Sequence, residues 1–371
     1  MRDILGAVTA TDTATEDPAT LAGEYATLTE RCGLVDRSER GKLALTGAGA
    51  VEFLNGQVTN ELVGLKPGDG CYAAFLTHKG KMLGDLRVLA VAERKGAPSA
   101  PDGRHVEGDE GASQPRELLL DTERMALQAL FDMIRRFKVG YEVELHKRTL
   151  ERSLLSLIGP DANAVATKAF AADPASGHGP GEPPEREDGH VLVRLELTPV
   201  RLIRTDMGID ALFDSGALEA VRGALRAAGA TEVSEAAAEI VRVEHGRPRY
   251  GIDLDESTIP QEAGLNERAV SFTKGCYVGQ ETVARLHYKG KPNRHLRGLR
   301  LSAPVEPGAE LRLGERPVGH LGSSVVSPAL GPIGLALVRR EAEPGMTVTV
   351  PSQGATGLAP PSAVVTELPF A

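Results

Sequence analysis

The C-terminal segment constrains the fold of this 371-residue chain most, because short strand-like runs alternate there with turns that contain Gly and Pro. The expected strands cover residues 296–301, 310–313, 318–326, 334–338, 346–350 and 363–368. Many short strands separated by such turns are typical of a small barrel. The sequence therefore predicts a separate C-terminal β-barrel over residues 295–371.

The longer part of the chain, residues 24–294, mixes helical and strand-like segments without regular βαβ alternation. Helices are expected at 24–32, 50–54, 123–137, 159–170, 212–225 and 235–244, and strands at 42–45, 71–76, 83–92, 117–121, 139–145, 153–158, 190–197 and 200–204. In segment 123–137 the apolar residues from Leu127 to Phe137 recur at helical spacing and predict one buried face. The mixture predicts an α+β body made of two intertwined subdomains.

Three segments are expected to lie outside this body. Residues 1–23 are rich in Thr, Ala and Asp and predict a flexible N-terminus. Residues 93–115 and 171–189 are dense in Gly and Pro and predict exposed insertions.

Composition excludes several classes of protein. The net charge of −9 argues against a nucleic-acid binder with a basic surface throughout, and the absence of Trp argues against a wide stacking platform for single strands. The first residues contain no apolar leader, and no later run is long enough to span a bilayer, so we expect a cytoplasmic protein with no membrane partner. Scattered histidines predict no bound metal, and three distant cysteines fit a reducing compartment.

One of these cysteines lies in the octapeptide Lys-Gly-Cys-Tyr-Val-Gly-Gln-Glu at residues 274–281. We expect Cys276 at or just before a helix N-terminus and beside Lys274, and both neighbours would favour the thiolate. The alternative is a small buried cysteine that only packs. Three cysteines cannot supply the four thiolates of a permanently held iron–sulfur cluster, so a reactive Cys276 would act in transfer.

A basic segment follows the octapeptide. Residues 282–305 contain no Asp or Glu and carry six basic side chains, namely Arg285, Lys289, Lys291, Arg294, Arg297 and Arg300. This segment is either a docking patch for an anionic ligand, a protein partner or tRNA, or an ordinary solvated surface.

The octapeptide resembles the signature of the YgfZ-type folate-binding proteins, which are relatives of the glycine-cleavage aminomethyltransferase (GcvT). Weaker matches extend the resemblance over residues 24–371, at 36–38, 43–47, 53–60, 76–83, 242–251 and 313–340. The resemblance implies a GcvT-like, ring-shaped fold of three parts with tetrahydrofolate, or a one-carbon derivative, in the central opening. It also implies a role in the assembly or repair of iron–sulfur enzymes, including those that modify tRNA.

The resemblance also nominates site residues. Asp85 ends the Gly-Lys-Met-Leu-Gly-Asp segment and is the candidate to hold a proton near the reactive folate nitrogen. Asp210 occupies the position of a carboxylate that accepts two hydrogen bonds from the pterin ring, although it is one methylene shorter than the Glu of the aminomethyltransferases. Arg242, Tyr250, Lys274 and Gln280 are the further candidates for cofactor binding. Each has a structural alternative, such as a solvated turn Asp at position 85 or a core tyrosine at position 250.

Three functions remain open from the sequence. The first is a tetrahydrofolate-binding accessory protein for iron–sulfur enzymes, with Cys276 as the functional thiol. The second is a GcvT-type, folate-dependent aminomethyltransferase or demethylase, in which Asp85 takes part in catalysis. The third is a scaffold that has lost folate and binds partners through residues 282–305.

Overall fold

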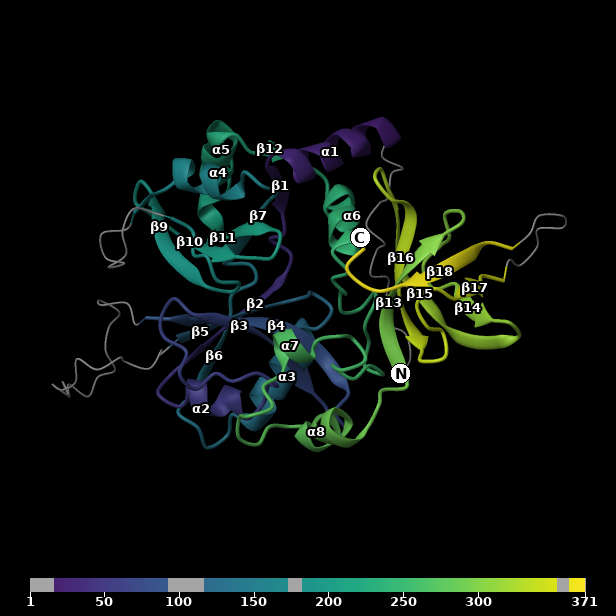
Figure 1. The fold of residues 1–371 in the computed structure, drawn as a ribbon. Coiled ribbons are helices and arrows are strands. Elements are labelled where there is room, and N and C mark those ends of the chain that lie inside the picture. Colours follow the sequence, from purple (N-terminus) through teal and green to yellow (C-terminus); the bar gives the residue numbers. More distant parts are fainter. Residues whose placement is uncertain (1–16, 93–116, 173–181, 352–359, 371) are drawn as a thin grey trace, which may run out of the picture.

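The computed structural model describes residues 17–92, 117–172, 182–351 and 360–370, which form three parts: a seven-stranded sheet, a five-stranded sheet and a closed barrel (Figure 1). The predicted residues 93–115, most of 1–23 and part of 171–189 lie outside the described residues. The predicted α+β body and the C-terminal β-barrel are both confirmed.

The chain enters the seven-stranded sheet first, leaves it, and later returns. In the order of the sheet, its strands are β12 (Thr231–Glu232), β1 (Gly33–Asp36), β7 (Arg152–Ile158), β11 (Gly208–Asp214), β10 (Thr198–Arg204), β9 (His190–Leu195) and β8 (Ala171–Ala172). Two helices, α4 (Ala162–Ala169) and α5 (Leu218–Ala228), pack their apolar residues onto one face of this sheet. A single 3-10 turn, η2 (Ser215–Ala217), precedes α5.

The five-stranded sheet is built between the first and second visits to the other sheet. Its strands, in order, are β3 (Gly70–Leu76), β4 (Met82–Val91), β5 (Glu117–Thr122), β2 (Gly41–Thr46) and β6 (Glu144–Lys147). Its core is closed by α2 (Ala50–Asn55) and α3 (Leu127–Phe137), and Phe53, Phe75 and Leu130 are fully buried there.

Two predictions for this region were wrong in part. Helix α3 begins at Leu127 rather than at residue 123, and its buried positions include Met133, whereas Phe137 is 44% exposed. The strand expected at 139–145 is instead a turn through Gly140 followed by β6, and Val139 is 83% exposed. A left-handed glycine at position 140 ends the helix, so the apolar residues around it do not continue a regular element.

Strands β1 and β11 were not expected from the sequence. Both pair with β7, and β1 also pairs with β12, so each is fixed by strands distant along the chain.

The two sheets face each other across an apolar contact. Leu89 of β4 packs there with Leu154, Ile203 and Leu212 of the seven-stranded sheet. This contact fixes the relative position of polar residues at the margin of both sheets.

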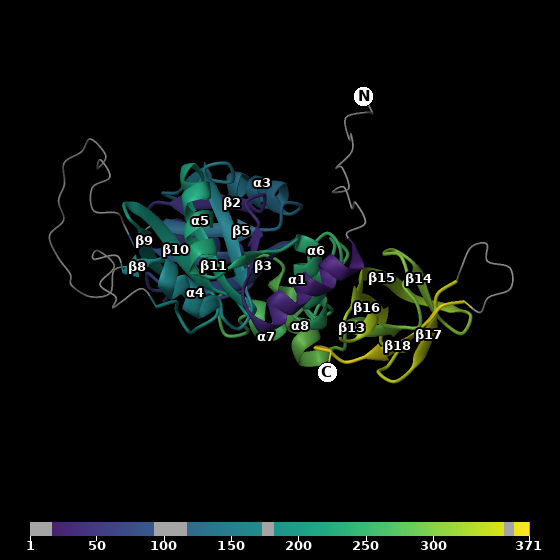
Figure 2. The ribbon, with the colours of Figure 1, turned by 90° about the horizontal axis from the view of Figure 1, so that it is seen from above.

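Helix α6 (Glu235–Glu244) lies between the seven-stranded part and the barrel (Figures 1 and 2). Its predicted N-cap is confirmed, because the Ser234 hydroxyl accepts a hydrogen bond from the Ala237 backbone N–H at 3.2 Å. Helix α1 (Pro18–Glu30) packs along α6 and begins at Pro18, inside the segment predicted to be flexible.

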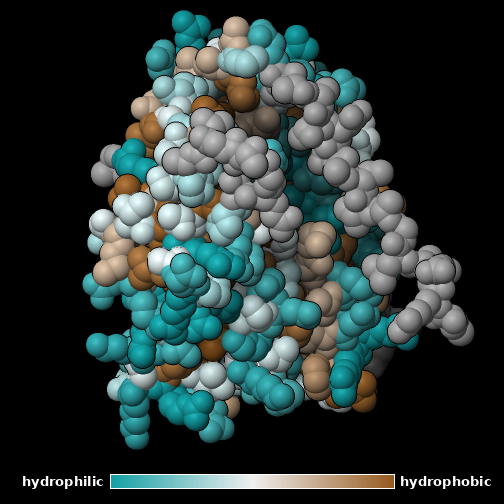
Figure 3. Space-filling model, turned by 90° about the vertical axis from the view of Figure 1, so that its right-hand side faces the viewer, coloured by the Kyte–Doolittle hydropathy of each residue, from teal (hydrophilic) through white to brown (hydrophobic). Residues whose placement is uncertain are grey.

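The barrel is a closed ring of six strands. In order these are β13 (Arg294–Leu301), β16 (Gly331–Arg339), β15 (Arg316–Ser327), β14 (Glu310–Leu313), β17 (Thr347–Thr349) and β18 (Ser362–Thr366). Its outer side is largely hydrophilic, with hydrophobic residues scattered over it (Figure 3). Before the barrel, α7 (Asn266–Ala269) and α8 (Gln280–Lys289) pack on the five-stranded part, where Tyr277 and Val283 are buried beside Leu76 and Met82.

Candidate functional site

A pocket of about 160 Å³ lies where the two sheets of the body meet. It is lined by six carboxylates and four arginines together with several uncharged residues. The charged residues are Asp85, Asp121, Glu187, Asp188, Asp206, Asp210, Arg37, Arg40, Arg87 and Arg268. A pocket with this composition suits a polar ligand that both donates and accepts hydrogen bonds.

Asp85 enters the pocket from β4 and is only 5% exposed. Its carboxylate accepts a hydrogen bond from the Tyr72 hydroxyl at 2.6 Å. Burial raises the pKa of Asp85 to about 6, and the Tyr72 hydrogen bond opposes this shift without cancelling it. Near neutral pH the side chain can therefore hold or release a proton, which is the property expected of a residue that assists proton transfer.

Asp210 enters the same pocket from β11 on the opposite sheet. One of its oxygens accepts a hydrogen bond at 2.6 Å from Ser156, its partner on β7, and the other lies 2.8 Å from Nη2 of Arg87. The same Arg87 nitrogen donates to Asp121 at 2.8 Å. Arg87 thus joins the two sheets through a carboxylate from each.

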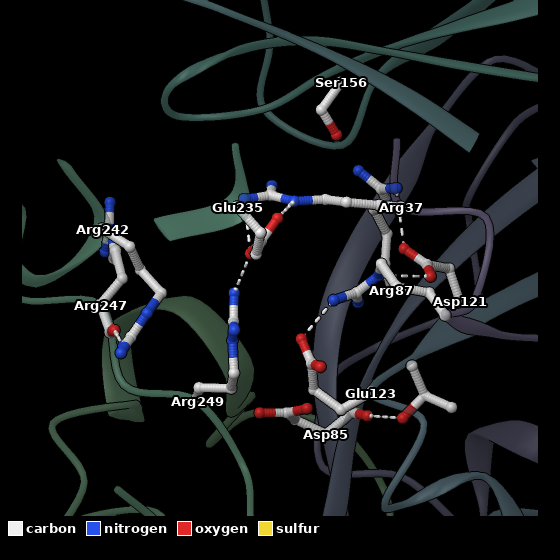
Figure 4. Close-up of polar contacts among 12 residues, drawn as sticks. Arg37, Asp85, Arg87, Asp121, Glu123, Ser156, Glu235, Arg242, Arg247 and Arg249 are labelled. Carbon is white, nitrogen blue, oxygen red and sulfur yellow. Dashed lines mark hydrogen bonds and ion pairs between the residues drawn. The ribbon is translucent and has the colours of Figure 1, made fainter. Parts of the chain in front are cut away.

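Paired charges continue from the pocket toward α6. Burial alone would raise the pKa of Asp121, but Arg40 and Arg87 hold it below the ordinary value. Arg37 and Arg249 both bind Glu235 at the start of α6, at 2.9 and 2.7 Å (Figure 4). These contacts fix the arginine side chains on this side of the pocket.

The sequence did not predict one wall of the pocket. Glu187 and Asp188, inside the predicted insertion 171–189, line it directly. Glu187 pairs with Arg268, whose guanidinium carbon lies 5.2 Å from the centre of the Tyr72 ring. The only local signal was the Asp-Gly step at 188–189, which is equally typical of any surface turn.

Comparison with known proteins gives this arrangement a family context. Residues 12–98 match the model of the GCVT N-terminal domain, and residues 294–371 match the glycine cleavage T-protein C-terminal barrel domain. The chain therefore resembles the glycine cleavage T-protein in these two segments, its N-terminal domain and its C-terminal barrel.

Individual relatives agree with this GcvT-like assignment. The chain is 28% identical over 341 residues to "Putative transferase At1g60990, chloroplastic" of Arabidopsis thaliana, covering 91% of this chain and 71% of that protein. It is 28% identical over 338 residues to the aminomethyltransferase of Mycobacterium tuberculosis, covering 87% and 82%. The crystal structure of the glycine cleavage system aminomethyltransferase T from Bartonella henselae matches with a TM-score of 0.77 and 24% identity, over 95% of this chain and 90% of that one. The predicted GcvT-like fold is thereby confirmed.

The GcvT-like structure brings two of the predicted site residues together, since Asp85 and Asp210 line one pocket from opposite sheets. Arg242 does not line this pocket. It is 5% exposed and binds Glu239, Asp253 and the barrel residue Ser323, so it joins α6 to β15. Tyr250 does not line the pocket either; it is half-buried and packs against the cores on both sides of β3.

Lys274 also has a structural role. It is 7% exposed, and its ammonium donates to the backbone oxygens of Asn55, Val58 and Asn60 at 2.7, 2.9 and 2.6 Å. Burial lowers the pKa of Lys274 to about 8. These three acceptors hold the ammonium at the loop of residues 55–60, so its observed role is structural, and the expected support of a Cys276 thiolate stays a prediction.

Cys276 itself is exposed, whereas Cys32 and Cys71 are buried. It lies before Gly279, the N-cap of α8, so the expected position close to a helix N-terminus is confirmed. Gln280 is the first residue of α8, and its amide donates to the Gly275 backbone oxygen at 3.4 Å, which closes the Cys276 loop. Neither Cys276 nor Gln280 lines the pocket between the sheets.

The basic segment 282–305 is partly neutralised in this GcvT-like fold. Arg294 pairs with Glu262 at 2.8 Å, and Arg297 pairs with Glu367 at 3.0 Å. Arg285 and Lys289 are exposed on α8. No helix among residues 17–92, 117–172, 182–351 and 360–370 is long and apolar enough to cross a membrane. Within the same ranges, no three His, Cys, Asp or Glu side chains are grouped to hold a metal ion.

Proposed function

We propose that this protein binds tetrahydrofolate, or a one-carbon derivative of it, in the pocket between the sheets and assists the assembly or repair of iron–sulfur enzymes, including those that modify tRNA. The observation that carries folate binding is the meeting of Asp85 and Asp210, from different sheets, in one pocket. Both positions also match those that the family resemblance implies for folate contacts.

The residues present fit a reduced pterin. Its amino group and ring N–H groups are donors, which the pocket carboxylates can accept, and its carbonyl oxygen is an acceptor for arginine. Arg87 is 8% exposed and its Nε has no hydrogen-bond partner among the described residues, so one buried donor is available. The pocket volume of about 160 Å³ corresponds to on the order of ten water molecules, enough for one fused ring system.

Asp85 is the residue suited to handle a proton at the bound folate. Tetrahydrofolate supplies a basic nitrogen that carries one-carbon groups, and a carboxyl group with a pKa of about 6 can exchange a proton with it near neutral pH. The Tyr72 hydroxyl orients the Asp85 carboxylate, and the Asp85 side chain is largely buried.

The accessory role is supported by Cys276. Its thiol is exposed and lies outside the folate pocket, which suits contact with another protein better than chemistry on folate. A single thiolate could ligate iron transiently during transfer, with iron as cargo rather than as a resident cofactor. The protein would then have folate and iron–sulfur enzymes or assembly factors as partners, in the cytoplasm.

An aminomethyltransferase is the second candidate. It is favoured by the relatives that carry this name and by the titratable Asp85 at the pocket. Turnover of tetrahydrofolate with a lipoylated, aminomethyl-loaded carrier protein would favour this enzyme function over the accessory role.

Folate binding is tested by calorimetry with tetrahydrofolate under anaerobic conditions. We expect binding by the unchanged protein and weaker binding by Asp85→Asn, while Asp132→Asn, on an exposed position of α3, serves as the control. Failure of the unchanged protein to bind would refute the folate proposal.

The accessory role is tested by complementation in a strain that depends on this protein. Cys276→Ala should lower the activity of client iron–sulfur enzymes, and Thr273→Ala, exposed in the same loop, should not. Full client activity with Cys276→Ala would exclude a role for the thiol.

A further inference from the structure

Asp188 lies in the pocket in a backbone conformation that is rare for a residue with a side chain. Its φ is +61°, and it lines the pocket beside Glu187. The backbone is held there from both sides: the Asp188 N–H donates to the Arg204 oxygen at 3.0 Å, and the Arg204 N–H donates to the Gly189 oxygen at 2.9 Å. Asp adopts this left-handed region more readily than most residues, and the two hydrogen bonds fix the backbone of Asp188 at the edge of the pocket.

The carboxylate of Asp188 differs from the other five that line the pocket. Asp85 accepts from Tyr72, and the rest pair with arginines. Among these six, the Asp188 carboxylate alone has neither a hydrogen bond nor an ion pair to any part of the chain that the structure describes. Burial raises its pKa to about 6, and the nearby charge of Arg87 only partly offsets this shift. A half-buried carboxylate without a partner is an acceptor left for a ligand.

Asp210 is less suited to accept a ligand than its position suggests. Both of its oxygens are engaged, one by Ser156 and one by Arg87. Turning its carboxylate toward a ligand would leave the buried Arg87 guanidinium with one carboxylate fewer, and removing one partner of a buried pair is strongly unfavourable. The ion pair of Arg87 and Asp210 therefore connects the two sheets.

The ligand is expected to have an edge with an amino group next to a ring N–H. We propose that the carboxylate of Asp188, rather than that of Asp210, binds this edge. Two parallel N–H donors match the two oxygens of one carboxylate, and the unpartnered Nε of Arg87 serves an acceptor atom of the same ligand. This inference rests on the proposed binding of a reduced folate, whose 2-amino-4-oxo ring has such an edge.

The test is calorimetric titration of the full chain with two ligands, tetrahydrofolate and its analogue in which a hydrogen replaces the 2-amino group. Asp188→Asn removes the charge and presents an amide that cannot accept both N–H groups, yet Asn tolerates positive φ. Asp210→Asn is the matched variant on the opposite wall. Asp188→Gly, which removes the carboxylate and the backbone strain together, is the second variant in case Asn perturbs the turn.

We expect Asp188→Asn and Asp188→Gly to weaken binding of tetrahydrofolate at least tenfold, or by about 1.4 kcal/mol, and binding of the analogue less than twofold. Asp210→Asn should weaken the binding of both ligands by similar factors, because it weakens the ion pair with Arg87 that connects the two sheets. The inference would be overturned if Asp210→Asn changed the ratio of the two ligand affinities more than Asp188→Asn does. Unchanged tetrahydrofolate affinity in both Asp188 variants would also overturn it. Absence of binding by the unchanged protein would instead refute the proposed function, and this inference with it.

Discussion

The substitution Asp85→Asn should stabilise the ligand-free protein, and should do so more at pH 8 than at pH 5. Burial raises the pKa of Asp85 from 3.8 to about 6, so the folded state binds more protons than the unfolded state between these values. Stability contributed by this group is therefore lost as pH rises through that window and stays lost above it. An amide does not titrate and avoids the loss.

The magnitude follows from the size of the shift. About two pKa units correspond to ~3 kcal/mol of unfolding free energy at high pH, of which about 1.4 kcal/mol develops between pH 5 and pH 8. The Tyr72 hydrogen bond is already contained in this shift, and the amide oxygen can accept the same bond, so no separate correction for this contact applies. A stabilisation of about 3 kcal/mol at pH 8 is expected.

Urea unfolding at both pH values measures this effect. Asp255→Asn is the control of opposite sign: hydrogen bonds from Ser257 outweigh burial and hold the pKa of Asp255 below 3.8, so its loss should destabilise the protein at pH 8. Destabilisation by Asp85→Asn at pH 8 would refute the conclusion that Asp85 is a buried carboxyl group with a raised pKa. An equal change in unfolding free energy at both pH values would refute it as well.

Three further outcomes are expected. In the native protein a thiol reagent should modify Cys276 alone, as read by mass spectrometry, since the other two cysteines are buried; equal labelling of all three would contradict this packing. Lys274→Met should lower the unfolding free energy by about 3 kcal/mol or more in urea, because three backbone oxygens lose their donor. Ser323→Ala should lower it by about 1–2 kcal/mol, since Arg242 loses its contact with the barrel; a melting temperature unchanged by calorimetry would argue against that link.

Elements whose signals are local could be predicted from the sequence. Helix α6 was expected at its observed bounds because Ser234 and Gly246 mark its ends, and Gly246 indeed has a φ of +66°. The barrel strands could be predicted for a similar reason, since turns that contain Gly and Pro separate them along the chain.

Elements that are fixed by partners distant along the chain could not be predicted from the sequence. Strand β11 contains a buried Asp in an otherwise apolar run, which no local rule favours in a strand. Asp210 is tolerated there because Ser156, 54 positions earlier, and Arg87 on the other sheet supply donors. The resemblance to a known family nominated Asp210, but it could not show that both oxygens of this carboxylate are engaged. The same resemblance placed Arg242 and Lys274 at the cofactor, where the structure gives both residues buried structural partners.

The features of the pocket that oppose folding are the strongest argument that it binds a ligand. Asp85 and Asp188 are both held where their ionisation is unfavourable, and a buried nitrogen of Arg87 lacks a hydrogen-bond partner. Outside the pocket, the buried charges of Arg242 and Asp253 are paired with each other, so the fold is able to satisfy such groups. Several groups of this kind in one cavity are what a site adapted to a polar ligand should show. A ligand that offers N–H donors to Asp188 and an acceptor to Arg87 would offset these costs together, which is why we place ligand recognition at this wall rather than at the already paired Asp210.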